Sequence, residues 1–201
     1  MFVKSNQNSN PSDLAARLDT ILRASPRLMQ VLTIARGLAL PDWRIVSGAV
    51  YQSVWNSLTG RDPDYGIRDY DLFYFDASDI SYEAEDVVIR RVAAAFEPPL
   101  REMVEVRNQA RVHLWFEAHF GEAYSPLSST DEALERFVAP AFAVGARLKA
   151  DGRLDIAAPL GLEDLFAMRL RPNPNRGLAK GWDKVIASAK ARWPEVVVDR
   201  S

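Results

Sequence analysis

The chain has 201 residues, of which 48% are hydrophobic and 26% charged, the proportions of an ordinary globular domain. Its 25 basic and 27 acidic side chains leave a net charge of −2, so no global positive field attracts nucleic acid and there is no strong nucleic-acid signature. With no cysteine and only two histidines, the chain excludes disulfides, thiol catalysis and a His-rich metal site.

The chain divides into a polar lead-in and one domain. Residues 1–12 are rich in Asn and Ser, and we expect them to be disordered. Neither an apolar signal segment nor a run of about 18 apolar residues occurs, so we expect a cytoplasmic protein that does not enter the membrane. The expected single domain, 13–201, comprises a helical layer, a core and a C-terminal extension of strands and helices, at 13–40, 41–120 and 121–201.

Two helices are predicted in the N-terminal layer. Ser12 is expected to cap the first, in which Leu14 and Leu18 begin an apolar stripe at helical spacing. The second is predicted to begin near Pro26, because proline suits the first turn of a helix. It ends before Pro41.

A turn of small residues follows a short strand predicted at 43–46. Glycine lets backbone N–H groups approach a phosphate, and a helix that begins here adds a favourable dipole. Ser47 and Gly48 are therefore candidate phosphate-binding residues. A loop rich in Pro, Gly and Asp is predicted at 61–66, after this helix.

Two carboxylates open the strand predicted at 69–75. Successive strand side chains point to opposite faces, so Asp69 and Asp71 share a face, about 6–7 Å apart along the backbone. A hard divalent cation, Mg²⁺ or Mn²⁺, is the simplest way to relieve their repulsion. The alternative interpretation is a solvated pair at a strand edge. Because both faces of this strand are apolar beyond its first turn, we expect it to be central and covered on both sides.

A third carboxylate is expected on the next strand, predicted at 103–107. A two-metal phosphoryl-transfer site requires an acid on a neighbouring strand, and Glu105 is the best candidate, with Glu102 and Asp76 as alternatives. A solvated edge residue again explains the pattern without a metal. Between the two strands, a helix is predicted from Ser81 to the Pro-Pro pair at 98–99.

Basic and polar residues surround these acids. Arg68 is placed to contact a triphosphate, and Arg107 and Arg111 are candidates for bidentate phosphate binding. Asn108 or His113 is a candidate contact to base or ribose. Each of these five residues has an equally simple interpretation as a structural or solvated side chain.

The C-terminal third is predicted to complete the sheet. Asp-Gly at 151–152 is a strong turn signal and predicts a β-hairpin over 141–157. Helices are predicted at 133–138, 163–169 and 178–193. The basic residues of the last helix either form a lip for an anionic substrate or, more simply, a solvated face.

Two of these motifs resemble a known superfamily. VSGAV at 46–50 and DYDL at 69–72 are similar to the Gly-Ser turn and the Asp-x-Asp strand of DNA polymerase β-like nucleotidyltransferases. The turn is most similar to the GGAVRD signature of CCA-adding enzymes and poly(A) polymerases. It differs in having Ser-Gly rather than Gly-Gly or Gly-Ser, and Tyr51-Gln52 in place of Arg-Asp. Over roughly 26–194, with segments such as VYQSVWN and VEVRNQARVHLWF, the chain resembles bacterial stand-alone nucleotidyltransferase proteins of undetermined substrate.

The resemblance implies an α+β fold, in which a small mixed β-sheet flanked by helices carries the site. It also implies an enzyme that moves a nucleoside monophosphate from a nucleoside triphosphate (NTP) to an unidentified hydroxyl acceptor, which is a small molecule, a protein or an RNA end. Asp69, Asp71 and Glu105 would be the catalytic acids and hold Mg²⁺ or Mn²⁺. Ser47, Gly48, Arg68, Arg107 and Arg111 would bind the nucleotide.

Two alternatives stay open on the same fold. The irregular turn fits a non-catalytic nucleotide- or protein-binding module. A toxin–antitoxin component would use the same chemistry on a different partner.

Overall fold

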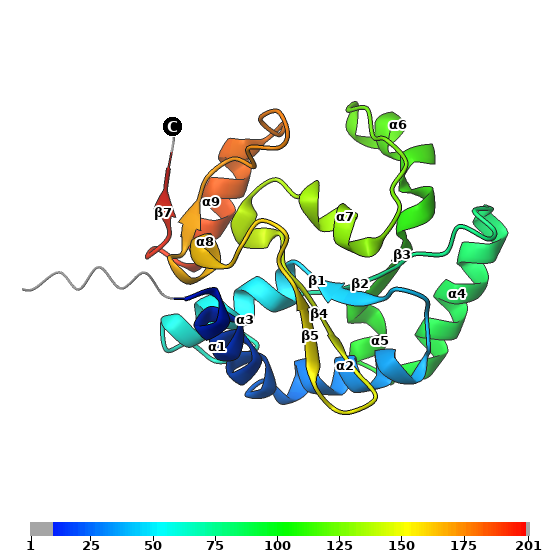
Figure 1. Cartoon of the computed structure of the whole chain (residues 1–201), viewed down its shortest axis with the longest axis horizontal. Helices are drawn as coiled ribbons and strands as arrows, with labels where there is room; N and C mark the ends of the chain where they lie inside the picture. Colours follow the sequence, from blue (N-terminus) through cyan, green and yellow to red (C-terminus); the bar gives the residue numbers. More distant parts are fainter. Residues whose placement is uncertain (1–9, 200–201) are drawn as a thin grey trace, which may run out of the picture.

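The computed structural model describes residues 10–199, which form a five-stranded mixed sheet with helices around it (Figure 1). The strand order is β3-β2-β1-β4-β5. The strands are Arg44–Val46 (β1), Tyr70–Tyr74 (β2), Val104–Asn108 (β3), Gly145–Leu148 (β4) and Leu154–Ala157 (β5). β2 and β3 are parallel and the other neighbours antiparallel. The predicted α+β fold with a small mixed sheet is confirmed.

The remaining elements lie on and beside this sheet. The α-helices are Pro11–Arg23 (α1), Pro26–Gly37 (α2), Gly48–Leu58 (α3), Tyr82–Ala95 (α4), Leu100–Met103 (α5), Phe116–Phe120 (α6), Thr130–Glu135 (α7), Glu163–Phe166 (α8) and Trp182–Arg192 (α9). Two 3₁₀ helices span Gln109–Leu114 (η1) and Pro140–Phe142 (η2). A second, two-stranded sheet pairs Arg169–Leu170 (β6) with Val197–Val198 (β7).

Side-chain caps fix where several helices begin. Ser25 and Ser81 each accept a hydrogen bond from a first-turn amide of α2 and α4. At α1 the prediction was wrong, because Asn10 rather than Ser12 caps the helix and Pro11 is its first residue. Part of the expected lead-in, 10–12, is therefore cap and helix, whereas residues 1–9 lie outside the described part of the chain.

The hydrophobic core fills the space between α1, α2, α3 and one face of the sheet. Leu18 of α1, Leu32 of α2 and Trp55 of α3 meet Tyr70 and Leu72 of β2, and all five side chains are fully buried. Burial of a side chain such as leucine stabilises a fold by about 1.5–3 kcal/mol, so this layer holds the sheet rigidly.

The other face of β2 is not covered as expected. Asp71 and Phe73 are only half-buried, so they alternate with the buried residues Tyr70, Leu72 and Tyr74. The prediction of a strand covered on both faces was wrong, because the helices of the core pack on a single face. The open face carries the candidate site.

The C-terminal elements follow the prediction with shorter helices. The hairpin is confirmed as β4 and β5, which pair across the turn at 151–152. α7 begins at Thr130 because the Ser129 side chain accepts a hydrogen bond from the Glu132 amide, and it ends before the predicted helix does. α7 is thus displaced toward the N-terminus from its predicted range of 133–138, whereas α8 and α9 lie inside theirs, and Gly181, in the left-handed conformation, precedes α9. Between residues 10 and 199, no helix combines the length and apolarity needed to cross a membrane.

Candidate active site

Three strand ends bring the predicted acids together. Asp71 of β2 is the register partner of Glu105 in the parallel strand β3, and of Val46 at the end of β1. Residues in register on neighbouring strands project to the same face, so the two carboxylates lie side by side. Asp69 immediately precedes β2, and its Oδ1 would lie 3.7 Å from a Cβ placed on Gly48. The Asp69 carboxylate therefore adjoins the start of α3.

The electrostatics of this cluster point to a missing positive charge. Burial raises the pKa of Asp71 to about 7, with further contributions from Asp69 and Glu105, while Arg107 opposes them. None of the three side-chain carboxylates forms a hydrogen bond or ion pair with another residue of 10–199. A cation among them would remove the repulsion, and carboxylate oxygens are the ligands that Mg²⁺ and Mn²⁺ prefer.

The side chains as they stand do not enclose a cation. Within residues 10–199, no three His, Cys, Asp or Glu side chains converge in a metal-binding arrangement. Asp69 and Glu105 are exposed, so both side chains have room to turn toward Asp71. The donor set fits a hard divalent ion, and the metal site itself stays a proposal.

The turn before α3 presents free amides to the same region. Ser47 adopts a positive φ of 51°, and its amide donates to the Val144 carbonyl at 3.0 Å. No side chain caps α3, so the first-turn amides of Gly48 and Ala49 have no acceptor within the helix. A Cβ on Gly48 would lie 3.2 Å from Gln52 Nε2, which leaves little space there for a side chain. This geometry is typical of an anion-binding helix N-terminus.

A large cavity unites the two features. It has a volume of ≈ 1060 Å³, and Ser47, Asp71, Glu105 and Arg107 line it. Residues of α6 and α7 and of the segment before α9 also line it. Ligand sites are typically concave pockets of this size with a few convergent polar groups.

The predicted arginines have different surroundings. Arg107 lines the cavity and is exposed, with one bond from its Nη1 to the Val106 carbonyl. Arg111 also lines the cavity, but its guanidinium is engaged in an ion pair with the buried Glu85 of α4. Arg68 is exposed and is not among the cavity residues. The structure thus brings Arg107 to the acids and gives Arg111 a structural partner.

Asn108 and His113 do not lie where a base or ribose contact would require. Asn108 is 2% exposed, and its side chain bonds both the amide and the carbonyl of Asp76, at 3.0 and 2.8 Å. His113 is not a cavity residue, and its Nδ1 is buried with no partner among the described residues. The Asn108 side chain joins the end of β3 to the segment that follows β2.

The alternatives for the third acid are also displaced. Asp76 lies beyond the opposite end of β2, where its carboxylate accepts from the Ser78 amide at 2.9 Å. Glu102 is exposed on α5, outside the cavity. Glu105 is therefore the acid that the register places beside Asp71.

A polar group behind the turn was missed by the sequence reasoning. Arg192 of α9 donates to Gln52 Oε1 at 3.2 Å, and Gln52 Nε2 donates to the Tyr51 hydroxyl at 3.4 Å. Burial raises the pKa of Tyr51, the Arg192 guanidinium opposes this shift, and Asp69 adds to it. The only sequence signal was the Tyr51-Gln52 pair, which stands where the similar signature has Arg-Asp. Arg192 thereby links α9 to Gln52 on α3, the helix that follows the turn at Ser47 and Gly48.

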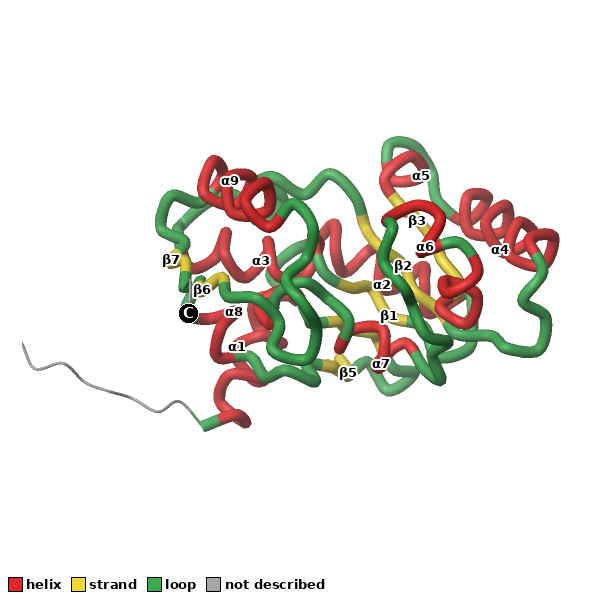
Figure 2. Tube along the Cα trace, turned by 90° about the horizontal axis from the view of Figure 1, so that it is seen from above, coloured by secondary structure: helices red, strands yellow, loops and turns green. Residues whose placement is uncertain are grey.

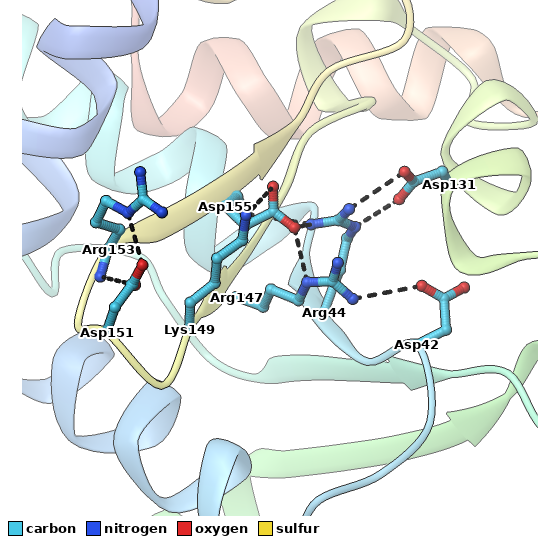
Figure 3. Close-up of polar contacts among 8 residues, drawn as sticks. All are labelled: Asp42, Arg44, Asp131, Arg147, Lys149, Asp151, Arg153 and Asp155. Atoms are coloured by element: carbon cyan, nitrogen blue, oxygen red, sulfur yellow. Dashed lines mark hydrogen bonds and ion pairs between the residues drawn. The ribbon is translucent and has the colours of Figure 1, made fainter.

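A network of ion pairs holds α7 to the sheet (Figure 3). Arg44 of β1, with a side chain only 5% exposed, bonds Asp131 of α7 at 3.2 Å and Asp155 of β5 at 3.3 Å. Arg147 bridges Asp155 to Asp42. Because α7 lines the cavity, this network fixes one of its walls.

The five-stranded mixed sheet and its helical cover have the architecture expected of a polymerase β-like nucleotidyltransferase. Residues 33–198 match the family described as "Nucleotidyltransferase", and the chain belongs to this family. The predictions of the superfamily and of a nucleotidyltransferase enzyme are confirmed. The bacterial source implied by the resemblance stays a prediction.

One solved structure illustrates the fold. It is described as "The NMR structure of the protein reveals a CCA-adding enzyme head domain". It superposes with a TM-score of 0.74 at 23% sequence identity, over 92% of this chain and 96% of that chain. The comparison with curated proteins gives no match.

Proposed function

We propose that this nucleotidyltransferase moves a nucleoside monophosphate from an NTP to a hydroxyl acceptor, with a divalent cation held by Asp69, Asp71 and Glu105. The observation that carries the proposal is the meeting of unpaired carboxylates with the uncapped N-terminus of α3 at one cavity. Acids for a metal and free amides for phosphates are the two parts that phosphoryl transfer needs.

Each group of residues has a separate task. The Ser47 hydroxyl and the free Gly48 amide hold β- and γ-phosphate oxygens, which become the leaving pyrophosphate. Arg107 adds positive charge at the cavity floor, beside the acids. Arg111 and Arg68 are secondary candidates, because one is paired with Glu85 and the other lies outside the cavity.

The reaction is a displacement at the α-phosphorus. The acceptor oxygen forms a new bond to the α-phosphorus, the bond from that phosphorus to the bridging oxygen breaks, and pyrophosphate leaves. Glu105, exposed and without a partner in the described structure, takes the acceptor's proton. Mg²⁺ or Mn²⁺ bound to the acids supplies neutralisation of phosphate charge and lowers the pKa of the acceptor hydroxyl.

A thermal-shift panel tests the proposal without knowledge of the acceptor. ATP, GTP, CTP and UTP are each added with Mg²⁺ or with EDTA to wild type and to Asp69→Asn/Asp71→Asn. A ligand at about 100 times its Kd stabilises by roughly 2.7 kcal/mol, or about 5–10 °C in Tm. We expect a shift with at least one NTP that requires Mg²⁺ and is lost in the double variant.

Glu105→Gln and Glu102→Gln form a matched pair for the third acid. Both remove one exposed carboxylate from neighbouring positions, but only Glu105 borders the cavity. Loss of the NTP shift in Glu105→Gln alone supports the assignment. Equal loss in Glu102→Gln, or no NTP shift in folded wild type, contradicts the proposed function.

A further inference from the structure

A cluster of aromatic rings lines the cavity opposite the acids. This aromatic wall consists of Trp115, Phe116, His119, Phe120 and Tyr124. Its rings pack on one another: the centroid of the Phe116 ring lies 4.6 Å from that of Phe120 and 4.4 Å from that of Tyr124. Phe120 is 49% exposed, and α6 contributes no fully buried residue.

The wall does not belong to the hydrophobic core. Its aromatic rings are absent from both clusters of core residues and their packing partners. Aromatic faces that point into an open cavity are poorly satisfied by water, and a planar ligand that stacks on them is their natural partner. The wall is thus suited to bind a flat ring.

The charged groups around the wall are already engaged. Arg136 forms an ion pair with Glu132, and Arg176 forms one with Glu122. Lys180 Nζ donates to a backbone carbonyl at 3.0 Å. Since these cations have partners within the protein, they leave no free set of charges for a polyphosphate or a nucleic-acid backbone. A neutral ligand fits this wall better than an anionic one.

The wall and the turn before α3 follow the two strands that flank β2. α3 follows β1, whereas η1 and α6 follow β3, and β2 with Asp71 runs between these two strands. Figure 1 shows α3 to the left of β2 and α6 above it, and in Figure 2 α6 lies over β2 and β3, away from α3. In-line transfer places the attacking oxygen opposite the leaving pyrophosphate. If the turn holds the pyrophosphate, the acceptor hydroxyl enters from the wall.

We infer that the aromatic wall is the acceptor subsite, and that it takes a small neutral molecule that carries both a hydroxyl group and a planar aromatic or heteroaromatic ring system. This inference rests on the proposed function, because it uses the direction of transfer. The acceptor oxygen gains the nucleoside monophosphate, its proton passes to Glu105, and pyrophosphate departs on the opposite side.

Trp115 provides a fluorescent reporter for this wall. The other four tryptophans are at most 8% exposed, whereas Trp115 is half-buried at the cavity. Acrylamide quenching of wild type minus that of Trp115→Phe therefore reports on the wall. The probes are adenosine, thymidine and 2-phenylethanol, with ribose as the ringless comparison, each measured in Mg²⁺ with and without the non-transferable donor α,β-methylene-ATP.

The expected result is protection of Trp115 by the ring-bearing probes and not by ribose. Phe120→Ala should weaken their binding by about fivefold or more, the loss of one stacking ring. Val87→Ala is the matched control, because Val87 is 57% exposed on α4 and lies outside the cavity. Its probe binding should equal that of wild type.

Three results would overturn the inference. These are no protection by any of the three probes, displacement of the probes by α,β-methylene-ATP, and tighter, strongly salt-dependent protection by a short oligoadenylate. The second would assign the wall to the donor base, and the third to a nucleic-acid end. If wild type shows no Mg²⁺-dependent NTP thermal shift, the proposed function fails. If it shows that shift but binds no probe, only the assignment of the aromatic wall as acceptor subsite fails.

Discussion

Asp71 on β2 and Glu105 on β3 are register partners in the one parallel strand pair of the five-stranded sheet. The pairing places the two carboxylates on the same face near the first residues of both strands, and Asp69 immediately precedes β2. Burial, and then the charges of Asp69 and Glu105, raise the pKa of Asp71 to about 7. A cation among these carboxylates would relieve their repulsion.

The first prediction concerns pH. The pKa of Asp71 is raised from 3.8 to about 7, so the native state holds a proton that the unfolded state releases at lower pH. The associated stability is complete below about pH 4 and is lost as the pH rises through about 7. Asp71→Asn, which cannot ionise, should be more stable than metal-free wild type at about pH 8, by about 1–3 kcal/mol.

Thermal melts of both proteins in EDTA, over a pH series, measure this difference. It should shrink toward zero near the acid end and also shrink when Mg²⁺ is added to wild type. A difference that is independent of pH would show that Asp71 does not titrate in this way.

The second prediction separates a structural from a ligand-binding role for Arg111. Its guanidinium pairs with Glu85, which is 4% exposed and also accepts the Asn108 amide at 2.8 Å. Arg111→Gln leaves that buried carboxylate without its cation, and we expect a loss of about 3–5 kcal/mol in the free energy of unfolding. Urea unfolding measures it, and Glu85→Gln/Arg111→Gln should recover much of the loss. Full stability of Arg111→Gln with weaker NTP binding would assign Arg111 to the nucleotide instead.

The third prediction concerns the phosphate-binding turn. Gly48 has an ordinary φ, and an added Cβ would meet the flexible end of Gln52 at 3.2 Å, so Gly48→Ala should stay within about 1 kcal/mol of wild-type stability. The same methyl group stands where phosphate oxygens must approach the amides. NTP affinity should therefore fall about tenfold or more, equivalent to about 1.4 kcal/mol. Titration of the Mg²⁺-dependent thermal shift tests this, and unchanged affinity would remove Gly48 from the site.

The fourth prediction concerns the network around Arg44. Arg44→Met removes the cation that joins α7 to β5, and we expect a loss of about 1–3 kcal/mol because its partner carboxylates keep some solvent. Arg153→Met is the matched control on the β4–β5 hairpin, since the Arg153 side chain is 79% exposed in its pair with Asp151. That control should stay within about 0.5 kcal/mol.

The pH dependence of this loss has a defined sign. Burial disfavours the charged form of Asp155, but Arg44 and Arg147 more than offset this and hold its pKa below the ordinary value. The stability gained from the pair is present above the ordinary pKa and is lost as the pH falls through the lowered one. Denaturant melts of Arg44→Met and wild type should therefore differ most at neutral pH and converge in acid. Equal losses for Arg44→Met and Arg153→Met would contradict the role of Arg44.

Local patterns in the sequence determined the elements that carry the proposed site. The turn at Ser47 and Gly48, the paired acids of Asp69 and Asp71, and Glu105 on a following strand were all predicted, because strand alternation and turn chemistry depend on near neighbours. The hairpin at 151–152 was predicted for the same reason, since an Asp-Gly turn sets its own geometry.

Contacts between distant segments required the tertiary structure. Arg111 was predicted as a phosphate ligand, but only the packing of α4 on β3 brings Glu85 to it. Arg192 was predicted to lie on a solvated helix face, but the packing of α9 brings it to Gln52. No local pattern singled out the aromatic wall, and only its place in the same cavity as Asp71 distinguishes it from core. The physical reason is that burial and charge pairing depend on long-range packing, which the local order of residues does not specify.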